Sequence, residues 1–408
     1  MGINNLKKFL RENYPDVIVY SHITEFSGEK IGIDISSYFY KYKTIFGDDW
    51  LNAFVSLICS LKKFDVHGVF IFDGTPPPEK NREKEKRKKA KTDLEEKVMT
   101  LSVELDIYKD TQTPTTLLLE TMEKIVKNNK KVTKVTRLLH AGKKKDESGS
   151  YIDVEAIEEY IKKKEKQIVN ISKEEIDDIK KMLTLFGAPY IQAPGEAEAL
   201  ASYLSSIGKV KAVLTEDTDI LTYGTETFIS DFNTSSGSCE TILLSEVLSS
   251  LEYTMDEFRD FCIMCGTDYN DNMLNYACKK VFKIINEHRS IDKFIEKEEK
   301  KKNPLDYKIL NHKRGRELFQ TYGNLKIDEL DKYKTPYWET NIKFDDLYDF
   351  LVSKKCRFSP NNIEKLWTGP EIVFDEDDEN DSKEENKEEN KEVVEVIIEE
   401  TINSIVIS

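Results

Sequence analysis

The protein has 408 residues, of which 39% are hydrophobic and 34% charged, and its formal net charge is −15. A chain of this length can hold one large α/β domain or two smaller ones around a sizeable core. No apolar run approaches the ~18 residues that a membrane-spanning helix requires, and six scattered cysteines without a signal peptide predict an intracellular, non-secreted protein with reduced thiols.

The negative charge is concentrated near the C-terminus. Residues 375–400 contain 14 acidic and three basic side chains, so residues 1–374 carry a net charge of only −4. Two stretches within that larger part are basic: residues 80–91 hold eight Lys or Arg and two Glu, and residues 124–145 hold nine and no acidic residue. Concentrated positive charge of this kind can bind a polyanion such as nucleic acid.

Short apolar segments that end in acidic residues alternate with segments of helical period. We expect strands at Lys30–Asp34, Gly68–Asp73 and Lys211–Thr215, and weaker ones at Phe228–Asp231 and Thr241–Leu244. Helices are expected between them, at Leu51–Phe64, Lys173–Phe186 and Glu196–Ile207. The alternation predicts an α/β fold with a mostly parallel central sheet flanked by helices, and such sheets bind ligands at the carboxyl ends of their strands.

Three stretches depart from this alternation. Residues 80–170 are rich in Lys and Glu and mostly helical in pattern, and the pattern of residues 256–290 predicts a compact helical module. The module contains a CxxC, Cys262 and Cys265, but no second CxxC or His pair accompanies it at ligand spacing, so we interpret the segment as a structural helix rather than a zinc site. From residue 371 onward the chain is acidic and of low complexity, which predicts disorder.

Seven carboxylates stand on apolar-flanked motifs, several of them where predicted strands end. They are Asp34, Asp73, Glu196, Glu198, Asp217, Asp219 and Asp268. A single DxD or ExE motif is weak, because solvated loops contain many of them. Like charges in one pocket raise one another's pKa, however, and divalent cations relieve that conflict. Ligation by oxygen alone suits Mg²⁺ or Mn²⁺, and two such ions ~3.5–4 Å apart serve in-line attack on phosphodiesters.

Six segments, in order along the chain, carry a resemblance to a known family. They are MGINNLKKFL, IGIDISSYFY, FIFDGTPPPEK, APGEAEALA, LTEDTDILTYG and CGTDYNDN. With them the chain resembles the flap endonuclease / XPG family of structure-specific 5′ nucleases over most of residues 1–290, and residues 346–366 resemble the family's helix beyond the nuclease region. The resemblance implies a PIN-like 5′-nuclease fold with a helical arch and a helix–hairpin–helix-like module at residues 256–290. It also implies a Mg²⁺-dependent flap endonuclease and 5′–3′ exonuclease that acts on DNA in replication or repair.

The resemblance assigns the seven carboxylates to two Mg²⁺ ions, for which Mn²⁺ could substitute. One ion would be held mainly by Asp34, Asp73, Glu196 and Glu198, and the other by Asp217, Asp219 and Asp268. The resemblance gives Glu216 no metal role.

The resemblance also implies residues that touch DNA. Lys80 and Arg87 match the basic pair that steers the scissile phosphate, and their spacing of seven predicts one helix face. Tyr40 matches an aromatic side chain that stacks on a base, although a core tyrosine is the alternative. Gly2 matches the N-terminus that approaches the DNA once Met1 is removed.

Two features depart from the family pattern. Glu196 follows Asp73 by 123 positions, so the arch is enlarged, with residues 141–164 as the expected insertion. The helical module has no glycine after Gly266, where the family has a glycine-rich hairpin that grips duplex phosphates and a potassium ion. We therefore expect an altered duplex grip without the potassium site, with Lys279 and Lys280 left to hold phosphate.

Four regions follow from this interpretation: an N-terminal nuclease region at 1–105, an enlarged arch at 106–170, an internal nuclease region at 171–370 and an acidic tail at 371–408. No glutamine-led, aromatic-ended peptide of the kind that binds sliding clamps stands near the C-terminus. We expect a monomer on DNA, without a clamp, in the nucleus or another DNA-replication compartment. Two alternatives stay open: a phosphatase with an aspartate nucleophile, and a non-catalytic DNA-binding scaffold, against which the retention of all seven carboxylates argues.

Overall fold

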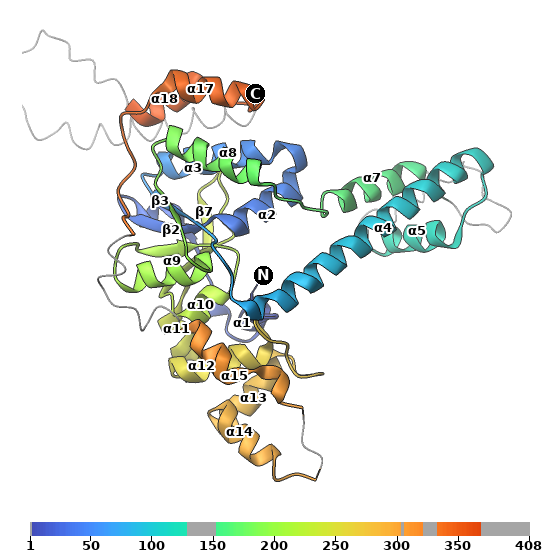
Figure 1. Cartoon of the computed structure of the whole chain (residues 1–408), viewed down its shortest axis with the longest axis vertical. Helices are drawn as coiled ribbons and strands as arrows, with labels where there is room; N and C mark the ends of the chain where they lie inside the picture. The colour runs from blue at the N-terminus through green and yellow to red at the C-terminus, as the bar shows by residue number, and fades with distance from the viewer. Residues whose placement is uncertain (1, 129–151, 303–305, 321–332, 369–408) are drawn as a thin grey trace, which may run out of the picture. The chain divides into compact units, whose positions relative to one another are not determined.

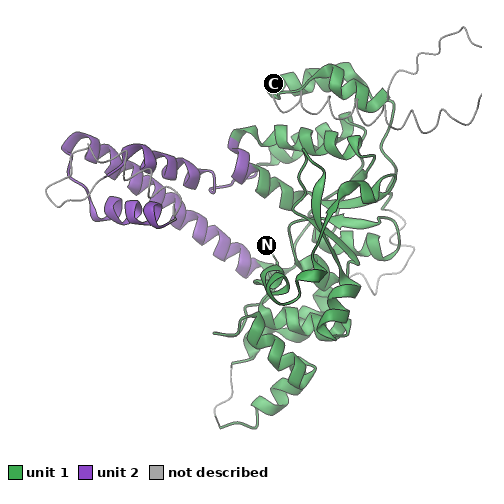
Figure 2. Ribbon diagram, turned by 180° about the vertical axis from the view of Figure 1, so that it is seen from behind, with its two compact units in different colours: residues 1–42, 48–80, 172–408 green, residues 43–47, 81–171 purple. Residues whose placement is uncertain are grey.

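The structure is a computed structural model of the chain and describes residues 2–128, 152–302, 306–320 and 333–368. The chain falls into two compact units, which Figure 2 colours separately. Unit 1 comprises residues 1–42, 48–80 and 172–408, and unit 2 comprises residues 43–47 and 81–171. The predicted insertion at 141–164 is described only from residue 152, and the predicted acidic tail lies outside the described residues.

A mixed sheet forms the centre of unit 1. The strands in the described residues are β1 Val19–His22, β2 Lys30–Asp34, β3 His67–Phe72, β4 Tyr190–Gln192, β5 Ala212–Leu214, β6 Thr227–Ser230 and β7 Ser238–Leu243. Their order is β1-β7-β6-β5-β2-β3-β4, and Figure 1 labels β2, β3 and β7 of this sheet. Four of the six pairings are parallel, and β7 runs antiparallel to both β6 and β1. The prediction of a mostly parallel sheet is confirmed, and all five predicted strands are present, together with β1 and β4.

Helices surround the sheet and extend from it. Those that belong wholly or mainly to the described part of unit 1 are α1 Leu6–Asn13, α2 Ile35–Phe46, α3 Trp50–Lys63, α8 Lys173–Leu185, α9 Ala197–Ser206, α10 Asp219–Tyr223, α11 Leu244–Leu251, α12 Met255–Cys265, α13 Cys278–His288, α14 Ile291–Glu298, α15 His312–Phe319, α17 Phe344–Ser353 and α18 Pro360–Thr368. Short 3-10 turns are η1 Pro15–Val17, η2 Ile23–Phe26, η3 Gly47–Asp49, η4 Pro78–Lys80 and η5 Lys308–Leu310. The three predicted helices correspond to α3, α8 and α9 within one or two residues at each end.

Successive side chains of the central strands face different helices. Val69 and Ile71 of β3 share a core cluster with Leu200 of α9. On the other face of β3, a Cβ at Gly68 would lie against Leu61 of α3. Because side chains alternate along a strand, helices on both faces require apolar residues at nearly every position. That requirement explains the uninterrupted apolar runs in the sequence.

The chain makes a close backbone approach where β3 and β4 end. A Cβ at Gly74 would lie 2.1 Å from the carbonyl oxygen of Ala193, so this position requires glycine. The Gly74 N–H donates to the carbonyl of Gly195 at 2.7 Å. This contact places Asp73 beside the start of α9, which carries the predicted ligands of the APGEAEAL motif.

The predicted helical module corresponds to α12, α13 and the connection between them. Cys262 and Cys265 lie buried on α12, as expected of a structural helix. The connection contains two residues with positive φ, Gly266 at 96° and Asn275 at 65°. Asparagine adopts the left-handed conformation more readily than most residues. Asn275 therefore supplies a left-handed turn where the sequence offers no glycine.

Unit 2 is helical in its described residues and has an apolar core of its own. Its helices are α4 Asn81–Thr111, α5 Thr116–Asn128 and α7 Val154–Glu165. The buried residues of the core are Val98, Leu101, Leu105, Leu118, Ile152, Ile157 and Ile161. The basic stretch of residues 81–91 forms the beginning of α4. No helix in the described part of the chain is long and apolar enough to cross a membrane. The four functional regions drawn from the sequence stay predictions.

Candidate active site

Parallel strands of the sheet deliver acidic residues to one edge. Asp34 is the last residue of β2, Asp73 follows β3, and Glu196 stands between β4 and α9. Asp217 lies in the loop after β5, and Asp219 is the first residue of α10. The strands β5, β2, β3 and β4 are neighbours in the sheet and run parallel. Their carboxyl ends therefore meet, as they do at the ligand sites of other α/β sheets.

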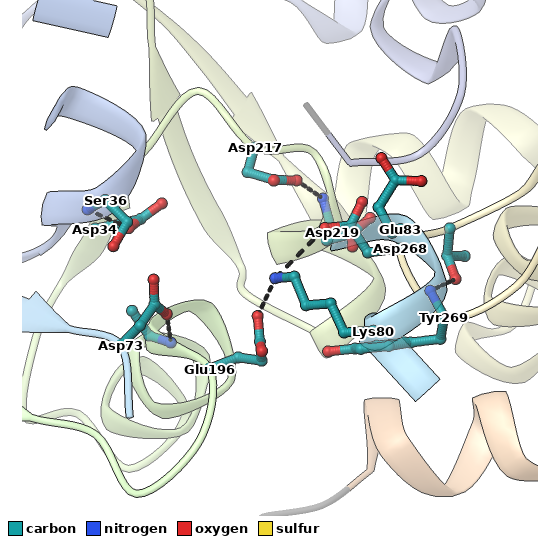
Figure 3. A network of polar contacts seen from close by, with 12 residues as sticks. Asp34, Ser36, Asp73, Lys80, Glu83, Glu196, Asp217, Asp219, Asp268 and Tyr269 are labelled. Atoms are coloured by element: carbon teal, nitrogen blue, oxygen red, sulfur yellow. Dashed lines mark hydrogen bonds and ion pairs between the residues drawn. The ribbon is translucent and has the colours of Figure 1, made fainter. Parts of the chain in front are cut away.

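Three of these carboxylates form a compact group. Asp73, Glu196 and Glu198 each offer an oxygen that lies within 4.8 Å of the other two. Glu196 is the N-cap residue of α9, and Glu198 lies in the first turn of that helix. Acidic groups are stabilised at a helix N-terminus. Figure 3 shows the surroundings of this group, with Asp34 on one side and Asp217, Asp219 and Asp268 on the other.

Electrostatic interactions join the remaining carboxylates to this group. Burial raises the pKa of Glu198, and the negative charges of Asp34, Asp73 and Asp217 raise it further. Burial likewise raises the pKa of Asp219, and the negative charges of Asp217 and Asp268 raise it further. The structure thus brings all seven predicted carboxylates into one site.

Backbone N–H groups fix the orientation of individual carboxylates. Oδ1 of Asp34 accepts from the N–H groups of Ser36 at 3.0 Å and Ser37 at 3.3 Å. Oδ1 of Asp73 accepts from the N–H of Ala197 at 2.8 Å. These donors belong to the first turns of α2 and α9, where N–H groups have no partner within the helix. Backbone N–H groups therefore orient one oxygen of each aspartate, and Oδ2 of Asp34 accepts from the hydroxyl of Thr215 at 2.9 Å.

Lys80 supplies positive charge at the centre of the cluster. Its Nζ pairs with Glu196 and lies 3.4 Å from Oδ2 of Asp268. Burial lowers the pKa of Lys80, but the charges of Glu198, Glu196 and Asp268 outweigh burial and raise it above its ordinary value. Lys80 is therefore a permanent ammonium group among the carboxylates.

The position of Lys80 shows that the predicted helix face shared by Lys80 and Arg87 was wrong. Lys80 is the last residue of η4 and precedes α4, so it does not share a helix face with Arg87. The Pro-rich sequence before Lys80 favours this turn, because prolines restrict the backbone ahead of a helix. Arg87 lies on α4 of unit 2, where its Nε donates to Oε1 of Glu83 at 2.9 Å.

The residues fit divalent cations. Oδ1 of Asp219 is buried and has no hydrogen-bond partner in the described part of the chain. A buried unpartnered carboxylate oxygen is costly unless a cation binds it. The donors around it are carboxylate oxygens, which suit hard ions such as Mg²⁺. The acidic cluster can therefore hold metal.

The structure also places the predicted DNA-contacting residues. Tyr40 of α2 has 46% of its surface exposed, which excludes the alternative of a core tyrosine. Gly2 packs against the Asp217–Asp219 turn, since a Cβ there would lie 2.0 Å from Oδ1 of Asp217. Lys279 of α13 pairs with Glu12 at 3.0 Å, and the Nζ of Lys280 lies 3.6 Å from the centre of the Tyr276 ring. Their contacts with DNA stay predictions.

Sequence reasoning missed two side chains that brace the Asp217 loop. Thr215 hydrogen-bonds to both the Asp34 carboxylate and the Asp217 backbone. Lys41 of α2 pairs with Glu216, whose N–H donates to Oγ of Ser37 at 3.0 Å. Glu216 therefore ties the loop to α2. The only sequence feature pointing to Thr215 is its place between an apolar strand and two aspartates.

Comparison with known proteins identifies the family. The XPG N-terminal domain matches residues 1–94, and the XPG I-region matches residues 187–268. A probable RAD2-like endonuclease, 369L of Invertebrate iridescent virus 6, is 30% identical over 392 residues, which cover 90% of each chain. The chain belongs to the XPG family of RAD2-like endonucleases. Another family member, flap endonuclease 1 of Cryptosporidium muris, is 29% identical over 90% of this chain and 72% of its own.

Solved structures agree on the fold of this XPG-family protein. The catalytic core of Rad2 in complex with a DNA substrate superimposes with a TM-score of 0.52 at 16% identity, over 88% of this chain and 97% of Rad2. The predicted 5′-nuclease fold is thereby confirmed. The protein is a structure-specific nuclease of the XPG family, and its acidic cluster stands where the parallel strands end.

Proposed function

We propose that this XPG-family protein is a Mg²⁺-dependent 5′ nuclease that hydrolyses DNA at flaps or other single-strand/duplex junctions, in DNA replication or repair. The observation that supports the proposal most is the gathering of seven carboxylates at one sheet edge with Lys80 among them. A cluster of this charge is useful when divalent cations bind it and is otherwise only destabilising.

The four residues Asp34, Asp73, Glu196 and Glu198 would hold one ion, and Asp217, Asp219 and Asp268 the other. Bound there, two divalent cations would supply charge stabilisation for in-line hydrolysis of a phosphodiester. The chain itself orients the carboxylates through the first turns of α2 and α9. Lys80 offers its ammonium group to a phosphate oxygen, a role that fits its placement among the ligands.

DNA would reach this site along exposed residues of unit 1. Tyr40 is exposed and can stack on a base. Lys279 and Lys280 at the start of α13 can contact duplex phosphates. The DNA-bound Rad2 structure, which shares this fold, supports DNA as the substrate. The role of Arg87 at the scissile phosphate rests on the sequence match alone. The same chemistry at a recessed end would give 5′–3′ exonuclease activity.

A substrate panel tests the proposal. Flap, nicked, gapped, bubble and blunt DNA are incubated with purified protein in Mg²⁺ or in EDTA, alongside a small phosphomonoester. We expect junction cleavage only with Mg²⁺. Asp217→Asn should abolish cleavage and retain DNA binding, whereas Asp16→Asn, a change at an exposed position of η1, should behave like wild type. Faster turnover of the phosphomonoester than of any DNA would instead support a phosphatase, and binding without cleavage would support a scaffold.

A further inference from the structure

Thr215 is a fully buried residue between two of the carboxylate-bearing segments. It directly follows β5, and its N–H donates to the carbonyl of Ile229 at 3.1 Å. Its hydroxyl makes two hydrogen bonds: Oγ1 donates to Oδ2 of Asp34 at 2.9 Å and accepts from the N–H of Asp217 at 3.1 Å. An N–H group can only donate and an ionised carboxylate can only accept, so both bonds have a defined direction.

The hydroxyl joins two groups of hydrogen bonds across the site. At one end, the N–H groups of Ser36 and Ser37 donate to Oδ1 of Asp34. At the other end, Oδ1 of Asp217 accepts from the N–H of Asp219 at 2.9 Å. Thr215 is the link between these two groups. The hydrogen bonds therefore run from the first turn of α2, through Asp34 and Thr215, to the turn that begins α10.

We propose that the Thr215 hydroxyl is a positioning group for the binding of divalent cations: it orients the Asp34 carboxylate and holds the backbone that carries Asp217, and so sets the spacing of the two aspartates. The inference rests on the proposed function. The two aspartates belong to opposite ligand sets of that function, so the hydroxyl couples the two ion sites. The residue is fully buried, so bulk water does not reach its hydroxyl. Partners that orient metal ligands in this way typically contribute 10–100-fold to metal affinity or activity.

Valine has the shape of threonine without the hydroxyl, so Thr215→Val isolates the hydrogen bonds. Thr215→Ser restores the hydroxyl and removes only a methyl group. The matched control is Thr225→Val: Thr225 is also fully buried in unit 1, and its Oγ1 has no hydrogen-bond partner in the described part of the chain. Circular dichroism and thermal unfolding in EDTA establish that each variant is folded.

Two measurements are made on each variant. The first is Mg²⁺ and Mn²⁺ binding without DNA, by calorimetry and by the metal-induced rise in Tm. The second is single-turnover cleavage of a 5′ flap across Mg²⁺ concentrations, with DNA affinity measured in EDTA. We expect Thr215→Val to bind metal and cleave about 10–100-fold less well with unchanged DNA affinity. Thr215→Ser and Thr225→Val should stay within about threefold of wild type.

Equal metal binding by Thr215→Val and Thr225→Val would overturn the proposal. If Thr215→Val does not fold, Thr215→Ser is compared with Thr215→Ala, which lacks the hydroxyl. Equally weak metal binding by these two variants would show that the hydroxyl is not the relevant group. Failure of the proposed function gives a different result, namely a wild-type protein that cleaves no member of the DNA panel. Metal binding without DNA still tests the role of Thr215 in that case.

Discussion

Gly2 shows how little space the site leaves around its proposed ligands. Its φ is +81°, in the left-handed region, and a Cβ there would meet Oδ1 of Asp217 at 2.0 Å and the N–H nitrogen of Asp219 at 2.7 Å. The next residues continue between two ligand loops, since the N–H of Asn4 donates to the carbonyl of Gly266 at 3.2 Å. The N-terminal segment therefore helps to shape the site.

Gly2→Ala should slow flap cleavage more than about tenfold, because even a 1 Å displacement of a reacting group is costly. The control is Gly208→Ala, another left-handed glycine with nothing within 4 Å of its added Cβ. Gly208→Ala should cost only about 1–2 kcal/mol of stability and leave cleavage unchanged. Equal cleavage rates for the two variants would show that the contact between Gly2 and Asp217 is unimportant.

Buried carboxyls make the stability of the metal-free protein depend on pH. Burial, with the charges of Asp73 and Asp217, raises the pKa of Asp34 from 3.8 to about 7. The folded state then binds a proton more tightly than the unfolded state does. This contribution to stability is full below the ordinary pKa and is lost as pH rises through about 7.

We therefore expect the Tm in EDTA to fall between about pH 5 and about pH 8. Mg²⁺ should remove most of the fall, because the cation favours the ionised carboxylates. Scanning fluorimetry at constant ionic strength measures both effects. Asp34→Asn, which cannot titrate, should show a shallower fall than wild type. A Tm that rises through this range would contradict the assigned pKa direction.

The connection between α12 and α13 shows how an element can keep its form with different residues. The sequence predicts an altered duplex grip, because no glycine follows Gly266. The structure shows Asn275 in the left-handed conformation, followed by the exposed Lys279 and Lys280 at the start of α13. The turn is thus formed, while the side chains around it differ from a glycine-rich hairpin. Lys279 and Lys280 place positive charge beside this turn, and their role in gripping duplex DNA stays a prediction.

Lys279→Ala and Lys280→Ala should each weaken binding of duplex DNA and reduce the salt dependence of log K by about one unit of slope per lost phosphate contact. Fluorescence anisotropy over a salt series measures both. Lys297→Ala is the control, because Lys297 lies on α14 and pairs with Glu287. A salt slope unchanged in both α13 variants would exclude this part of the module from duplex binding.

The whole chain consists of two units with separate apolar cores. Leu105 of α4 lies in the core of unit 2, and Leu200 of α9 lies in the core of unit 1. All seven proposed ligands and Lys80 belong to unit 1. Metal binding should therefore stabilise unit 1, whereas unit 2 depends on its own helix packing.

Calorimetry should resolve two unfolding transitions. Leu105→Ala should lower the unfolding free energy of unit 2 by about 2–5 kcal/mol, and Leu200→Ala should lower that of unit 1 by a similar amount. Mg²⁺ should raise only the transition that Leu200→Ala lowers. A single transition that both substitutions lower equally would show that the two units unfold as one.

Local sequence patterns predicted the central strands, the residues that meet at their ends, and the family. Apolar runs that end in aspartate predict β2 and β3, and the topology of parallel sheets then requires Asp34 and Asp73 to meet. Ordered motifs from Gly2 to Asp268 were enough to suggest the family, which the relatives confirm. These features depend on residue type and short spacing, which a sequence displays directly.

Tertiary structure decided the rest. Lys80 lies among the carboxylates because the fold brings η4 against the start of α9 and against the loop after α12. Its partners there, Glu196 and Asp268, are 116 and 188 positions further along the chain. The bridge from Thr215 to Asp34 joins positions that are 181 apart. Hydrogen bonds and steric limits of this kind depend on distances of a few ångströms between remote segments. The motif around Asp217 therefore predicted the candidate ligands, whereas the fold determined what holds these side chains in place.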